Sequence, residues 1–255
     1  MYVQDSFAKN FADRSQFMSF LDEIEERADW MVCPTDSLYL TAAEMNPAAC
    51  RKMKQAEDGE QLLNDTRLNT GLFIKADGMD YPLGTTAMKT LQNRARIYGN
   101  ALQDMDRPTF AGVLNDCLRV TSGQALLRIQ EGKIRAVHGG DPKDYAVLPM
   151  PEIFEAANLY LEESYGKVVF SEGYFSHELV TAAWQLQEPE YPSTGKLRRL
   201  CRVGLMQSHR KRSKKRFTVW KPDLPSLKSW TRSIAVCRSF CLFLIFIGRS
   251  SWNGA

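Results

Sequence analysis

The charged residues of this chain are divided unevenly along its 255 positions. Residues 1–193 contain 18 lysines and arginines against 29 aspartates and glutamates, a difference of −11. Residues 194–255 contain 15 cations and one acid, Asp223, a difference of +14. Such an asymmetry is typical of a tail that binds nucleic acid or a membrane surface, but a shifted reading frame also produces it. We therefore expect an acidic domain over 1–193 and a basic tail over 194–255, which is native or, alternatively, frameshifted or disordered.

The composition is that of a globular protein, with 44% hydrophobic and 25% charged residues. Charged residues interrupt the N-terminal segment, so no signal peptide is expected. Six cysteines without a Cys-x-x-Cys pair predict free thiols in a reducing compartment. The most apolar run, 241–247, is far shorter than the roughly 20 residues of a membrane-spanning helix. We expect a cytoplasmic protein with no membrane span.

Two pairs of apolar runs predict β-hairpins. Asp77-Gly78 divides the segment 71–83, and Glu131-Gly132-Lys133 separates 124–130 from 134–138. Asp and Gly tolerate the positive φ that tight hairpin turns require, so Asp77-Gly78 is a strong hairpin signal, and the second segment is also predicted to be a hairpin. Further strands are predicted at 37–41, 167–170 and 178–186.

Apolar residues three and four positions apart predict amphipathic helices. The clearest begins near Thr85 or Thr86, and its predicted buried stripe is Met88, Leu91, Ala95, Tyr98 and Leu102. Other helices are predicted at 15–29, after Asp106 (with Phe110, Val113, Leu114, Cys117 and Leu118 inward), and from Pro151 onward. The order of helices and hairpins predicts an α+β fold with mainly antiparallel hairpins and packed amphipathic helices, followed by an irregular or disordered tail.

Three segments carry a family likeness: Gly71–Leu83, GTTAMKTLQNRARIYGNAL at 84–102, and LLRIQEGKIRAVHGGDPKDY at 126–145. Over about residues 20–190 the chain resembles the phage/plasmid-like proteins of prokaryotes, a domain of unknown function. The resemblance implies a protein of phages, plasmids or their hosts, and it implies no activity. Members of that family continue past this region with ordered α+β sequence. The domain over 1–193 would then be truncated relative to the family, and the basic tail departs from it.

Cations in two places predict contacts with nucleic acid. The run 209–216, His-Arg-Lys-Arg-Ser-Lys-Lys-Arg, would neutralise phosphates and release counterions. The helix after Thr85 has a basic face, and its first amides near Thr85 and Thr86 would hold an anion. The alternative for both is a solvated or disordered charged surface. The candidate nucleic-acid-binding residues are Lys89, Arg94, Arg96, Arg135, Arg210, Lys211, Arg212, Lys214, Lys215 and Arg216.

Two histidines are candidates for acid–base or metal chemistry. His138 precedes two glycines and Asp141 at a strand end, where the alternative is a glycine turn. His177 lies near Glu172 and Glu178, but the spacing matches no metal signature. We therefore predict no catalytic residue, no metal and no cofactor. An enzyme would need His138, Asp141 and Arg135 or His177 to share one pocket.

The first functional hypothesis is a mobile-element protein that assists nucleic-acid handling, in replication, recombination or annealing. Its partner would be DNA or RNA. The alternative is a non-catalytic protein-interaction or anti-host module whose acidic surface meets a phage or host protein. A basic surface patch containing Lys89, Arg96 and Arg135 would favour the first hypothesis.

Overall fold

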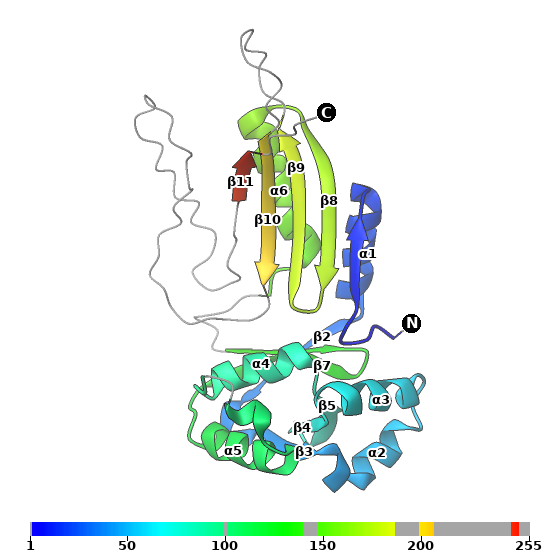
Figure 1. Ribbon diagram of the computed structural model, residues 1–255, viewed down its shortest axis with the longest axis vertical. Coiled ribbons are helices and arrows are strands. Elements are labelled where there is room, and N and C mark those ends of the chain that lie inside the picture. Colours follow the sequence, from blue (N-terminus) through cyan, green and yellow to red (C-terminus); the bar gives the residue numbers. More distant parts are fainter. Residues whose placement is uncertain (1, 99–100, 140–146, 187–198, 207–245, 250–255) are drawn as a thin grey trace. The chain divides into compact units, whose positions relative to one another are not determined.

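The computed structural model describes residues 2–98, 101–139, 147–186, 199–206 and 246–249 (Figure 1). These residues form two compact units. Unit 1 contains residues 2–7, 26–98 and 101–139, and unit 2 contains 8–25, 147–186, 199–206 and 246–249. Both units combine helices with antiparallel sheets, which confirms the predicted α+β class.

Within its described residues, unit 1 has two three-stranded sheets with the orders β2-β6-β7 and β3-β4-β5. The strands are β2 (Ala28–Pro34), β3 (Tyr39–Ala42), β4 (Leu72–Ala76), β5 (Met79–Pro82), β6 (Gln124–Gln130) and β7 (Lys133–Gly139). The helices are α2 (Pro47–Met53), α3 (Gly59–Asn69), α4 (Thr85–Arg94) and α5 (Arg107–Arg119), with 3-10 turns at Thr35–Ser37, Ala43–Met45 and Ala101–Asp104. Leu83 and Ile134 form a parallel bridge that joins the two sheets.

Both predicted hairpins of unit 1 are confirmed. Asp77 and Gly78 have φ of 48° and 76° between β4 and β5. Glu131 and Gly132 have φ of 52° and 73° between β6 and β7. Two central residues with positive φ match the twist of antiparallel strands, which explains why these dipeptides close the turns.

Helices α4 and α5 bury the sheets of unit 1. Helix α4 packs on β7, and α5 packs on β3. The inward stripe predicted for α5 is confirmed, because all five of its residues belong to or pack against one apolar cluster. Asp106 begins α5 by accepting a hydrogen bond from the Thr109 amide at 2.9 Å.

Helix α4 is shorter than the sequence pattern predicts. It ends at Arg94, and Arg96 adopts a left-handed conformation with φ of 61°. The amide of Ile97 then bonds the Gln92 carbonyl, and the Arg96 amide bonds that of Asn93, which closes the helix as a Schellman motif. Tyr98 is 61% exposed, so its predicted place in the buried stripe is wrong.

Strand β2 was not predicted, because residues 28 and 29 were assigned to the preceding helix. The helix α1 (Arg14–Glu26) ends earlier, and Ala28–Pro34 pairs with β6 along its entire length. A partner strand almost a hundred residues away therefore decides the conformation here, which is typical of β-propensity in a tertiary context.

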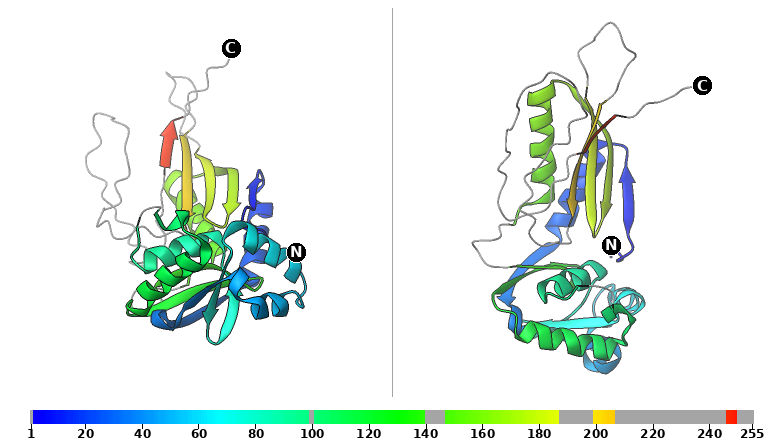
Figure 2. Two further views of the ribbon diagram at one scale, coloured as in Figure 1. Left: turned by 60° about the horizontal axis from the view of Figure 1, so that its bottom comes forward. Right: turned by 60° about the vertical axis from the view of Figure 1, so that its left-hand side comes forward.

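Unit 2 contains a five-stranded antiparallel sheet with the order β1-β8-β9-β10-β11 (Figure 2). Its strands are β1 (Ala8–Phe11), β8 (Val168–Ser176), β9 (Leu179–Leu186), β10 (Arg199–Met206) and β11 (Phe246–Arg249). Helices α1 and α6 (Met150–Tyr165) cover one face of this sheet. Phe17 of α1 contacts both Phe154 of α6 and Phe170 of β8, with ring centroids 5.2 and 5.9 Å apart.

Strand β10 belongs to the region expected to be an irregular tail. It pairs with β9 over eight residues, from Arg199 opposite Leu186 to Met206 opposite Leu179. The sheet edge at Leu186, which a truncated domain would leave open, is therefore paired. The domain boundary at 193/194 stays a prediction, and most of the tail lies outside the described residues.

No helix among the described residues is long and apolar enough to cross a membrane.

Candidate functional site

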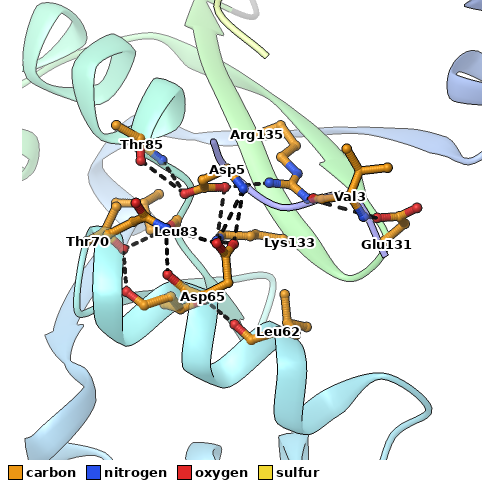
Figure 3. A network of polar contacts seen from close by, with 12 residues as sticks. Val3, Asp5, Leu62, Asp65, Thr70, Leu83, Thr85, Glu131, Lys133 and Arg135 are labelled. Atoms are coloured by element: carbon orange, nitrogen blue, oxygen red, sulfur yellow. Dashed lines mark hydrogen bonds and ion pairs between the residues drawn. The ribbon is translucent and has the colours of Figure 1, made fainter. Parts of the chain in front are cut away.

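Four buried charged groups of unit 1 converge in one network (Figure 3). The cations are Lys133 and Arg135 of β7, with side chains 0% and 1% exposed. Their partners are Asp5, from the segment before β1, and Asp65 of α3, with side chains 3% and 7% exposed. Buried charges require paired partners and hydrogen bonds, so three segments far apart in sequence are held together here.

The two cations of β7 flank Ile134, next to a β-bulge. Arg128 pairs with Ala136 and Ile129 with Ile134, so Arg135 is an extra residue without a partner on β6. The bulge lets Ile134 and Val137, three positions apart, both join the apolar core. In a regular strand they would point to opposite faces. Arg135, between these two core residues, contacts Asp5 and Glu131 of the network instead.

Asp65 lies at the α3 side of the network. Its carboxylate accepts hydrogen bonds from the Lys133 ammonium at 2.7 Å and from the Tyr2 hydroxyl at 2.5 Å. Burial alone would raise the pKa of Asp65, but the Lys133 and Tyr2 hydrogen bonds and the Lys133 charge together hold it below its ordinary value. Burial raises the pKa of Tyr2, and the hydrogen bond to Asp65 adds to this rise.

Asp5 lies at the first turn of α4. One carboxylate oxygen accepts hydrogen bonds from the Thr85 amide and hydroxyl at 2.9 and 3.0 Å. The other lies 3.0 Å from the Lys133 ammonium and 2.5 Å from the Arg135 guanidinium. One carboxylate is therefore surrounded by a helix N-terminus, a hydroxyl and two cations. Together these groups are the donor set of an anion site.

Residues 2–5 are held through their backbone as well. Arg135 donates to the Val3 carbonyl, and the Val3 amide donates to the Glu131 carboxylate at 2.8 Å. Glu131 lies 3.9 Å from Arg135 and 3.6 Å from Arg27. The segment is thus fixed by its main chain, by Tyr2 and by Asp5.

The structure gives the predicted basic residues different roles. Arg94 donates to the Thr35 hydroxyl and to the carbonyls of Ser122 and Gln124, which ties the end of α4 to the start of β6. Arg96 is exposed beyond the helix end, and Lys89 is half-buried on α4. Arg135 is buried, so the basic surface patch of Lys89, Arg96 and Arg135 that would favour the nucleic-acid hypothesis is not formed.

The other candidate residues lie in different units or outside the described residues. Arg210, Lys211, Arg212, Lys214, Lys215, Arg216 and Asp141 fall outside the described residues. His138 is buried in unit 1 beside Trp30, whereas His177 is buried in unit 2 beside Phe175. Among the described residues, no three His, Cys, Asp or Glu side chains gather as metal ligands would.

Sequence reasoning proposed an anion at Thr85 and named Arg135, but missed Tyr2, Asp5, Asp65 and Lys133 as parts of one site. One signal was present. Lys133 and Arg135 flank Ile134 within an otherwise apolar strand, and cations on a buried strand require acids nearby. Comparisons with protein-family models, with curated proteins and with solved structures found no match.

Proposed function

We propose that this chain is a phage/plasmid-like protein that assists nucleic-acid handling, and that the run 209–216 supplies its main contacts with phosphates. The observation that supports this proposal is the pairing of β10 with β9 along all eight of its residues. Strand β10 ends at Met206, only two residues before the basic run begins. The basic run therefore follows closely, in sequence, a strand that is paired within unit 2.

The charge of the run explains its affinity for phosphates. Six of its eight residues are lysine or arginine, and each phosphate that they neutralise releases condensed counterions. The contact would carry no base specificity, because phosphates are the same at every position. We therefore expect binding that is strongly salt-dependent and weakly dependent on sequence.

The test is a salt titration of DNA binding by the full chain. We expect replacement of the six cations by alanine to reduce the slope of log K against log salt by up to about 5 on duplex DNA. A matched control replaces six exposed cations of unit 1, Arg51, Lys52, Lys54, Arg67, Lys75 and Arg119, and should leave the slope nearly unchanged.

An unchanged slope in the first variant, or equal losses in both, would contradict the proposal. A folded chain that binds no nucleic acid at low salt would favour the protein-interaction alternative. The premise that the tail is native has its own test, which is translation of the other two reading frames beyond the codons for 185–200. A continuation with balanced charge and periodic apolar residues in another frame would remove the basic run from the protein.

A further inference from the structure

The donors around the Asp5 carboxylate are more numerous than one carboxylate needs. Its two oxygens already accept from Thr85, Lys133 and Arg135. The buried Nε of Arg135 has no hydrogen-bond partner among the described residues. A buried donor without an acceptor is destabilising because it has lost its hydrogen bonds to water, so a spare donor beside an anion needs an explanation.

Gln130 is a second observation that points to a larger ligand. It is fully buried, and neither its amide nitrogen nor its amide oxygen has a partner among the described residues. Gln130 is the direct cross-strand partner of Lys133, so the two side chains share one face of the hairpin. An unpartnered amide therefore lies on the face from which the Lys133 ammonium reaches Asp5.

We propose that these groups form a phosphate-binding site, and that residues 2–7 occupy it as an intramolecular substitute for the ligand. A phosphate group has more acceptor oxygens than a carboxylate, so it can use the donors that Asp5 leaves unfilled. The backbone amide of Thr85 and the α4 dipole favour a negative charge at this point. The fork of Arg135 and the point charge of Lys133 are common phosphate ligands.

The charges of the network permit this exchange. Asp65 stays paired with Lys133, and Glu131 stays beside Arg135 and Arg27 when Asp5 leaves. A phosphate monoanion in place of the Asp5 carboxylate leaves the net charge of the network unchanged. The bound phosphate would release Tyr2, Val3 and Asp5 from their contacts. The site belongs to unit 1 and does not depend on the basic run of the proposed function.

The test titrates orthophosphate into the full chain by calorimetry, at constant ionic strength set with chloride. Asp5→Ala removes the occupant, so phosphate should bind this variant at least about tenfold more tightly than the wild type, because no competing segment must leave. Asp5→Asn keeps the volume of the side chain, so it is the test variant if Asp5→Ala does not fold. It should also bind phosphate more tightly than the wild type.

Asp116→Ala is the matched control. It makes the same change in charge but removes an exposed carboxylate of α5 outside the network, so its phosphate affinity should equal that of the wild type. In the wild type, saturating phosphate should accelerate amide hydrogen exchange at residues 3–5. Equal phosphate binding by the Asp5 and Asp116 variants, no binding by either Asp5 variant, or unchanged exchange in the wild type would each overturn the proposal.

The Asp5→Ala variant can show whether the ligand is a free phosphate ion or a phosphate monoester at the end of a nucleic acid. A dinucleotide with a 5′-phosphate and its 5′-hydroxyl counterpart are titrated beside orthophosphate. Binding of the phosphorylated dinucleotide alone assigns the site to phosphate monoesters at nucleic-acid ends. Binding of orthophosphate alone assigns it to the free ion. Equal binding of the two dinucleotides would overturn recognition of a terminal phosphate monoester, because both contain the same internal phosphodiester.

Discussion

The ammonium of Lys133 lies 2.7 Å from the carboxylate of Asp65, inside a unit where neither side chain is more than 7% exposed. The attraction between two such charges is offset by the loss of their hydration, so the pair itself is weak support for stability. Removal of only one partner does lower the stability, because the other charge then remains buried and uncompensated.

Lys133→Met should therefore destabilise unit 1 by about 3–5 kcal/mol, since Asp5 and Asp65 both lose their shared cation. Urea unfolding followed by circular dichroism measures the effect. Arg119→Met is the control, because Arg119 and Asp116 form an exposed pair worth at most about 1 kcal/mol. Similar losses in the two variants would show that the network is not energetically coupled.

The network should also make stability depend on acid pH. Because the folded state holds the pKa of Asp65 below its ordinary value of 3.8, its contribution is present above that value. The contribution is lost as the pH falls through the lower, folded pKa. Asp65→Asn should be less stable than the wild type at neutral pH, and the difference should shrink as the pH falls below 3.8. A constant difference across this range would contradict the assignment.

Gly173 of β8 should not tolerate a side chain. A Cβ there would lie 2.6 Å from the ring of Phe17, which is itself packed between Phe154 and Phe170. We expect Gly173→Ala to destabilise unit 2 by about 1–3 kcal/mol through overpacking. Gly112→Ala is the control: it lies within α5 with no atom near its Cβ, and should stabilise by about 0.5–1 kcal/mol. Thermal unfolding should give opposite signs for the two variants.

A substitution at the C-terminal end of α4 should stabilise the protein. Arg96 has a φ of 61° at the position where a Schellman motif favours glycine, so Arg96→Gly should stabilise by about 1 kcal/mol. Lys89→Gly places glycine within the same helix and should destabilise by about 1 kcal/mol. Urea midpoints that move in the same direction for both variants would argue against this helix end.

The sequence predicts those elements of the fold that are determined by residues close together in the chain. Asp77-Gly78 identifies its hairpin because few dipeptides tolerate two positive φ values, and Gly132 supplies one of the two at the second turn. Helix α5 is predictable from its cap at Asp106 and from its apolar period. Strand β2 is not, because its pairing with β6 depends on a distant partner.

The site was less predictable than the fold. A cation such as Lys133 on a buried strand indicates that acids must lie close, but the pattern does not say which. Asp5, in a segment without regular structure, and Asp65, on a weakly periodic helix, have no local feature that marks them. The β-bulge at Arg135 has no clear sequence signal either.

The division of the chain into units has a consequence for biosynthesis. Unit 2 takes residues 8–25 from before most of unit 1 and 147–186 from after it, and β1 must wait for β8 to complete their pairing. Roughly 150 residues separate these strands, which corresponds to about 8–30 s of translation at 5–20 residues per second. Unit 1, with Tyr2 and Asp5 already synthesised, can close on the ribosome during that interval. The nascent β1 and α1 stay without their sheet until β8 emerges, which makes this interval the time when chaperones have most reason to bind.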